Sequence, residues 1–190
     1  MDIRDRNSNL YFNAKLLRNV KIQEFNDSAK KYINKSASVV ELEPKNRNDY
    51  KAINVAVNNW NNDSFGSNIA GSFNRLVMNQ NEDKSTHILA LTTQNKDYGS
   101  LKPDLIQGLM EIYEGQAVTD VFYLQVNPDI VYASESPKYK HVGKSLVTTL
   151  QDICDNKEIL LYSKESAMPF YKKLGFNYVN GITYSWKKKQ

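Results

Sequence analysis

Hydrophobic positions recur at helical spacing in the clearest stretch of this chain, residues 142–154. The predicted helix starts near Tyr139 to His141. Its apolar stripe consists of Val142, Leu146, Leu150, Ile153 and Cys154. The opposite face, which we expect to be solvated, carries Thr148, Thr149, Gln151 and Asp152. Apolar runs at residues 121–126 and 158–162 flank this helix. The pattern therefore predicts a right-handed strand, helix, strand crossover with parallel strands.

Further patterns predict elements on both sides of this unit. Residues 38–43 favour a strand, and residues 87–93 and 105–114 favour an antiparallel pair of strands. Two helices should lie between these strands, the first of them capped by Asn48. Their buried faces would be Ile53, Ala56, Val57 and Trp60 in the first helix, and Ile69, Phe73, Leu76 and Val77 in the second. Near the end, a short helix capped by Ser166 should stop at Gly175, and the Asn180-Gly181 pair predicts a β-hairpin turn.

The first 35 residues precede this pattern. Phe25, Ala29, Tyr32 and Ile33 fall on one face of an amphipathic helix. We therefore expect residues 1–35 to be a helical N-terminal extension packed on the domain or on a partner, and residues 36–190 to form one α/β domain.

Composition narrows the class of protein. The 25 basic residues exceed the 21 acidic ones and are spread along the chain, which argues against a nucleic-acid surface and agrees with a small anionic ligand. A single Cys154 suits a reducing cytoplasm. No run approaches the roughly 18 apolar residues of a membrane span, and no His, Cys and carboxylate cluster has metal-ligand spacing. We expect a cytoplasmic monomer or homodimer that binds no metal, membrane or nucleic acid.

The polar loop before residue 142 is the candidate anion site. The first N–H groups of a helix have no partners inside it and lie at the positive end of the helix dipole. Lys138, Lys140 and Lys144 add positive charge there, so we expect a phosphate-bearing ligand. A Walker A loop would need a glycine in place of Lys138. A dinucleotide fingerprint fails as well, because Gly143 is the only glycine between residues 115 and 175.

A third pattern fits when residues 158–176 are included. Residues 126–128, Val-Asn-Pro, end the central strand. The sequence AxxFYxxxGF is matched by Ala167, Phe170, Tyr171, Gly175 and Phe176. The chain resembles the GCN5-related N-acetyltransferase (GNAT) family, most strongly over residues 121–176. It departs from the family's RxxGxG or RxxGxA loop at Lys138 and His141, and Lys164 stands where some members carry a cofactor-binding asparagine.

The resemblance implies an α/β (α+β) fold of three layers, with a mixed, mostly antiparallel sheet, a splayed parallel strand pair and flanking helices. It implies acetyl-CoA as cofactor and transfer of the acetyl group to a primary amine of a small molecule or protein in a ternary complex. The pantetheine arm would bind along Leu124, Gln125 and Val126. The pyrophosphate would bind at Lys138, Tyr139, Lys140, His141, Val142, Gly143, Lys144 and Ser145, with Tyr171 also at the cofactor.

The resemblance also implies catalytic roles. Tyr171, rather than Phe170, would face the cleft. A phenol with a pKa of about 10 stays protonated at neutral pH, so it can donate its proton, or at least a hydrogen bond, to the thiolate of a thiol whose pKa is about 8.5. Asp120 is the candidate general base, with Glu111 and Glu114 as alternatives, although many members use an ordered water. The backbone N–H of Val126 or of its neighbour would stabilise the oxyanion. Residues 61–67, between the two helices, would border the acceptor. The alternative is an inactive CoA-binding or regulatory module, which His141 in place of a glycine favours.

Overall fold

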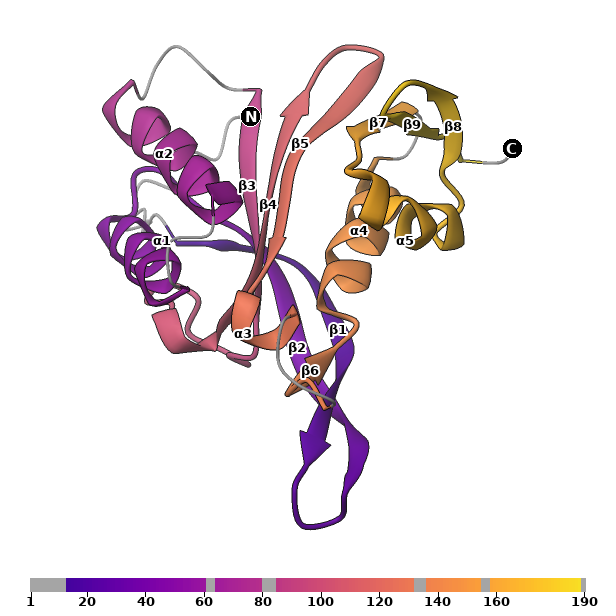
Figure 1. Cartoon of the computed structure of the whole chain (residues 1–190). Helices are drawn as coiled ribbons and strands as arrows, with labels where there is room; N and C mark the ends of the chain where they lie inside the picture. Colours follow the sequence, from indigo (N-terminus) through magenta and orange to yellow (C-terminus); the bar gives the residue numbers. More distant parts are fainter. Residues whose placement is uncertain (1–12, 61–63, 80–84, 132–135, 155–157, 189–190) are drawn as a thin grey trace, which may run out of the picture.

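The computed structural model describes residues 13–60, 64–79, 85–131, 136–154 and 158–188. Within these residues, nine strands form one mixed sheet in the order β6-β1-β2-β3-β4-β5-β7-β9-β8 (Figure 1). The strands are β1 Lys15–Asn26, β2 Lys31–Glu41, β3 Thr86–Thr92, β4 Ile106–Glu114, β5 Val118–Val126, β6 Tyr139–Lys140, β7 Glu158–Tyr162, β8 Asn177–Asn180 and β9 Thr183–Trp186. The α-helices are α1 Arg47–Asn59, α2 Ser64–Met78, α3 Pro128–Val131, α4 Val142–Ile153 and α5 Met168–Lys173. Two 3-10 turns are η1 Pro103–Leu105 and η2 Glu165–Ala167.

The sheet is covered on both faces, α1 and α2 on one and α4 and α5 on the other (Figure 1). Strand β4 is apolar at successive positions because both of its faces are covered. Leu109 packs in the cluster formed with α1 and α2, whereas Met110 packs in the cluster formed with α4, and neither is exposed. A strand buried on both faces needs apolar residues at odd and at even positions, because these point to opposite faces of the sheet.

The parallel pair of β5 and β7 diverges. The strands are paired only from Val118 opposite Glu158 to Val121 opposite Leu161, so the second half of β5 runs on without β7 beside it. The other strand pairs are antiparallel. The predicted fold class, a mixed and mostly antiparallel sheet with a splayed parallel pair and helices on both sides, is confirmed.

Several local predictions are confirmed, and four details are wrong. Ile153, predicted on the apolar stripe of α4, is 44% exposed at the last turn of the helix. Strand β7 has the predicted bounds, and Gly175 adopts the expected left-handed conformation, with φ +85°. The cap of α1, however, is Asn46, whose side chain accepts a hydrogen bond from the Asn48 N–H. Ser166 lies inside η2 and is not the cap of α5. Thr149 is fully buried, because its hydroxyl donates to the Ser145 carbonyl (2.8 Å) and so has a partner without solvent.

The helix predicted around residues 25–33 is also wrong. These residues belong to β1, β2 and the turn between them, and the hairpin extends beyond the rest of the sheet (Figure 1). Phe25 lies opposite Tyr32 across the two strands, with ring centroids 5.2 Å apart. Two residues seven positions apart can meet on one face of a helix or across a hairpin, so the spacing of Phe25 and Tyr32 could not distinguish the two structures. The predicted boundary at residue 35 falls inside β2, and residues 1–12 lie outside the described residues.

Candidate active site

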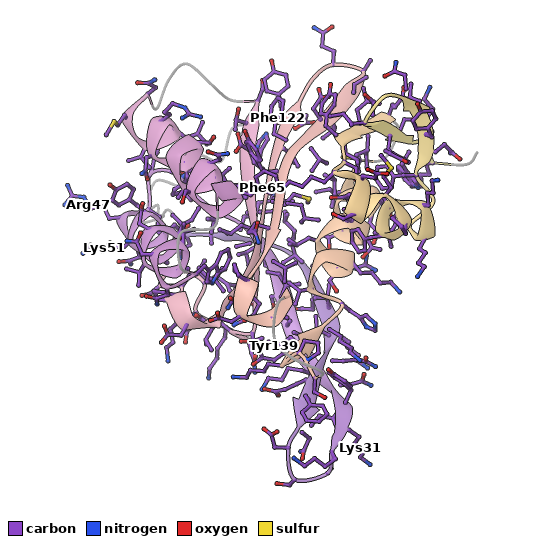
Figure 2. All side chains as sticks on the ribbon, viewed as in Figure 1. Lys31, Arg47, Lys51, Phe65, Phe122 and Tyr139 are labelled. Atoms are coloured by element: carbon purple, nitrogen blue, oxygen red, sulfur yellow. The ribbon has the colours of Figure 1, made fainter. Side chains whose placement is uncertain are left out.

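A pocket of about 770 Å³ lies where β5 continues past β7. Its walls come from the end of β5, the start of α4, α5 with the residues around it, and Phe65 of α2. Phe65 lies at the end of α2 nearest the central strands (Figure 2). The lining residues are Phe65, Leu124, Gln125, Val126, Lys140, His141, Gly143, Lys144, Lys164, Ala167, Phe170, Tyr171, Lys173 and Leu174.

The end of β5 presents backbone groups to this pocket. The Asn127 N–H donates to the Gln107 carbonyl at 3.0 Å, across the pairing of Gly108 with Val126. That bond makes Gly108 and Val126 a pair without mutual hydrogen bonds, because bonded and non-bonded pairs alternate in an antiparallel ladder. The N–H and C=O groups of Val126, and of Leu124 two residues earlier, therefore point away from β4 toward the gap left by β7.

The start of α4 supplies the second wall. The Ser145 N–H donates to the His141 carbonyl at 2.9 Å, so the N–H groups of residues 142–144 precede the first helical bond. His141 just before the helix has φ +71°, a left-handed conformation that favours glycine. A Cβ on Gly143 would lie 3.4 Å from Val126 Cγ2 and 3.5 Å from Phe170 Cζ. The helix start therefore lies directly against the end of β5 and α5.

Most of the predicted cofactor residues meet in this pocket. Those that line it are Leu124, Gln125, Val126, Lys140, His141, Gly143, Lys144 and Tyr171. The four other predicted loop residues do not line it. Val142 packs in the core, and Ser145 is buried beside a neighbouring groove. Lys138 accepts a bond from the Phe25 N–H through its carbonyl, and the Tyr139 hydroxyl donates to Glu24.

Asp120 lies apart from the pocket. It is in the half of β5 that is paired with β7, opposite Leu160, four residues before Leu124. Four residues of strand span roughly 13 Å. Burial raises the pKa of the Asp120 carboxyl above its usual range. The alternatives Glu111 and Glu114 do not line the pocket either, and Glu114 lies 3.6 Å from His87 in another groove.

Tyr171 is mostly buried between two aromatic rings. Its ring centroid lies 4.9 Å from that of Phe170 and 5.8 Å from that of Phe176, and 8% of the residue is exposed. Burial raises the pKa of Tyr171 to about 12. The prediction that Tyr171 faces the cleft and Phe170 does not is wrong in its second half, because both line the pocket. A phenol in this setting stays protonated at neutral pH.

The sequence assigned no role in the site to Lys164, Lys173 and Leu174, which also line the pocket. Phe65 belongs to the segment expected to border the acceptor, but it lies in the first turn of α2, with its ring centroid 5.5 Å from that of Tyr123. Lys164 lies with its Nζ 4.2 Å from the Phe65 ring centroid. No pattern in the chain could pair these residues, since nearly 100 positions separate them. Residues 61–63 of the expected acceptor loop lie outside the described residues.

Two further observations concern the whole described part of the chain. No group of three or more His, Cys, Asp or Glu residues within it could hold a metal ion. Among its helices, none is both long enough and apolar enough to cross a membrane.

Comparison with solved structures shows the fold class of this chain. A protein from Desulfovibrio desulfuricans assigned to the GNAT family of acetyltransferases is 14% identical, with a TM-score of 0.51, over 80% of this chain and 98% of that one. PaiA N-acetyltransferase from Thermoplasma acidophilum, in complex with coenzyme A, is 16% identical over 81% of this chain and 99% of its own, with a TM-score of 0.49. The N-acetyltransferase YlbP from Bacillus subtilis, also in complex with coenzyme A, is 13% identical over 73% and 91%, with a TM-score of 0.49.

The fold of this chain is therefore that of the GNAT acetyltransferases, as the resemblance implied. No protein-family model matches the sequence, and no curated protein matches it either.

Proposed function

We propose that this protein is an acetyl-CoA-dependent N-acetyltransferase that moves the acetyl group to a primary amine by direct transfer in a ternary complex. One observation carries this proposal. A single pocket of about 770 Å³ combines the open backbone edge at the end of β5 with the first turn of α4. The first feature suits the amide-containing pantetheine arm, and the second suits the pyrophosphate at the other end of that arm.

The residues of the pocket fit these two ends of the cofactor. The N–H groups of residues 142–144 would bind the pyrophosphate, with charge added by Lys140 and Lys144. The backbone N–H and C=O of Leu124 would hydrogen-bond the pantetheine amides. The Val126 carbonyl already accepts from Gln125 Nε2 at 2.6 Å, so only its second lone pair would be open to the cofactor.

Acetyl-CoA supplies an activated thioester, and the protein's own groups would stabilise the charges that develop during transfer. The Val126 N–H would donate to the oxyanion that develops when a neutral amine adds to the thioester carbonyl. The Tyr171 hydroxyl, which burial keeps protonated at neutral pH, would donate a hydrogen bond to the departing thiolate. Asp120 stays a prediction as general base. At its position on β5 it would accept the proton of the amine only through water.

Calorimetric titration with acetyl-CoA tests the cofactor assignment, with ATP and NAD as controls. We expect saturable binding of acetyl-CoA alone and about tenfold weaker binding by Lys144→Ala, since charged hydrogen bonds contribute about 1.5 kcal/mol or more. Lys172→Ala is the matched control, because Lys172 is an exposed lysine of α5 outside the pocket lining. Absence of both binding heat and thermal stabilisation by acetyl-CoA would refute the proposal.

Transfer itself requires a second measurement. Release of free CoA thiol in the presence of a panel of primary amines, with the acetylated amine identified by mass spectrometry, would establish the reaction. Saturable acetyl-CoA binding, without release of CoA thiol in the presence of any amine, would instead support the alternative, a module that binds the cofactor but does not catalyse transfer.

A further inference from the structure

The loop that leads into α4 is attached to the N-terminal hairpin as a third strand. Strand β6 pairs with β1, with Lys140 opposite Gln23 and Tyr139 opposite Glu24. The Phe25 N–H extends this pairing by donating to the Lys138 carbonyl at 2.8 Å. Tyr139 lies at the base of the hairpin, and Lys31 lies toward its tip (Figure 2).

The side chain of Tyr32, on β2, contacts this loop at two points. Its hydroxyl donates to the Pro137 carbonyl at 2.8 Å, and its ring lies under the Lys140 ammonium, with Nζ 3.7 Å from the ring centroid. The Tyr32 ring is itself held edge-on by Phe25. One half-buried tyrosine therefore fixes both the backbone of the loop and the charged end of Lys140.

Lys140 lines the pocket, so the position of its charge matters to an anionic ligand. An exposed lysine side chain usually samples many rotamers, and ordering it on binding costs free energy. A cation–π contact holds the ammonium in place before the ligand arrives. The same contact leaves the charge available, because the ring covers only one side of the ammonium.

We infer that Tyr32 is a positioning residue of the cofactor site, which orders the anion-binding loop and holds Lys140 at the mouth of the pocket. This inference rests on the proposed acetyl-CoA function. Tyr32 lies outside residues 121–176, where the motif match is strong, so the role comes from this chain's own N-terminal hairpin. Because coupling between two sites is reciprocal, CoA bound in the pocket must also stabilise the hairpin.

A double-mutant cycle on CoA affinity tests the inference. We expect Tyr32→Leu to weaken CoA binding about fivefold to tenfold, from the lost hydrogen bond and cation–π contact together. Tyr32→Phe keeps the ring and removes only the hydroxyl. It should therefore weaken CoA binding by about half as much as Tyr32→Leu on a logarithmic scale. Lys140→Ala should also weaken binding, and adding Tyr32→Leu to it should cost clearly less than Tyr32→Leu costs alone, since Lys140 is then absent.

The matched control is Tyr178→Leu, which removes a 59% exposed tyrosine from the β8–β9 hairpin, outside the pocket lining. It should leave CoA affinity unchanged. Hydrogen exchange gives an independent measurement. Saturating CoA should slow amide exchange in residues 22–25 and 32–35 of the wild-type protein, and should slow it less in Tyr32→Leu.

The outcomes separate the two proposals. If wild-type protein binds no CoA, the proposed function fails. If it binds CoA but Tyr32→Leu binds equally well, the positioning role is wrong. Equal and additive losses from Tyr32→Leu and Lys140→Ala, with no change in hairpin exchange on CoA binding, would also overturn it. That result would reduce Tyr32 to a residue that only supports the fold.

Discussion

Gly108 on β4 lies directly under the first turn of α4, and Gly108→Ala tests how closely that helix must approach the sheet. A Cβ at this position would lie 2.8 Å from Val142 Cγ1, 3.1 Å from Leu146 Cδ1 and 3.4 Å from the Gln125 carbonyl oxygen. Carbon atoms in contact normally lie about 3.5–4.0 Å apart. Val142 has little freedom to rotate away, because a β-branched residue in a helix has one strongly preferred rotamer. The start of α4 must therefore move by several tenths of an ångström or more.

The magnitude follows from two opposing effects. Overpacking a core by a methyl group costs about 1–3 kcal/mol. Replacing a glycine inside a strand returns roughly 0.5–1 kcal/mol, because the unfolded chain loses freedom. The two ranges leave a net loss of about 0–2.5 kcal/mol in the free energy of unfolding, with a midpoint of about 1 kcal/mol. For a chain of this length the midpoint corresponds to a Tm lower by roughly 2–5 °C.

Gly71→Ala in α2 is the matched control, because a Cβ there meets only Arg75 Nη1, at 3.9 Å. It should raise stability by up to about 1 kcal/mol. Thermal unfolding followed by circular dichroism measures both variants, and titration with acetyl-CoA measures the site. Gly108→Ala should weaken binding, and adding Val142→Ala should restore part of both losses. If Gly108→Ala behaved like Gly71→Ala in both assays, the close contact between α4 and β4 would not position the site.

Three other predictions concern single residues. His141→Gly should raise the Tm and tighten acetyl-CoA binding, because a non-glycine residue in the left-handed region costs about 1–2 kcal/mol; unchanged affinity in calorimetry would count against the loop assignment. Tyr171→Phe should lower turnover in the thiol-release assay without lowering the Tm, and unaltered turnover would remove Tyr171 from the mechanism. Burial raises the pKa of Asp49 to about 7 from 3.8 in spite of the hydrogen bond from the Glu43 N–H. As pH rises, the Asp49 carboxyl therefore ionises at a lower pH in the unfolded chain than in the folded protein. Stability should fall as pH rises from about 4 to about 7, and urea midpoints of Asp49→Asn should lack that slope; an equal slope in the variant would contradict the assignment.

The middle and end of the chain could be predicted because each element there has local signals. The apolar stripe of α4 is set by spacing, and Val142, Leu146 and Leu150 are all buried. The β8–β9 hairpin was predicted from the Asn180-Gly181 pair, but its turn lies one residue later: Asn180 ends β8 opposite Thr183, so Gly181 and Ile182 form the turn, and Gly181 has the positive φ, +49°, that a glycine-first turn requires. Gly175 ends α5 for the same reason. These features depend on residues close in sequence, so the chain alone carries the information.

The N-terminal hairpin could not be predicted, because its stability depends on partners far along the chain. Strand β1 pairs with β6 more than 100 residues later, and Tyr32 reaches the Pro137 carbonyl. Local periodicity contains nothing about such partners, and tertiary contacts override a weak helical pattern. The same limit applies to Asn46, which caps α1 in place of Asn48 because the geometry of the first turn decides between neighbouring residues.

The sequence by itself determined the fold class, the order of the main elements from α1 onward and the residues of the loop before α4. The tertiary structure alone decided which of those residues reach the pocket. Val142 packs in the core and the Tyr139 hydroxyl donates to Glu24, while Lys140 and Gly143 line the cavity. The tertiary structure also brought Phe65 and Lys164 together and left Asp120 outside the pocket. The physical reason is that a binding pocket forms between distant segments, and its composition depends on how they pack rather than on any one segment.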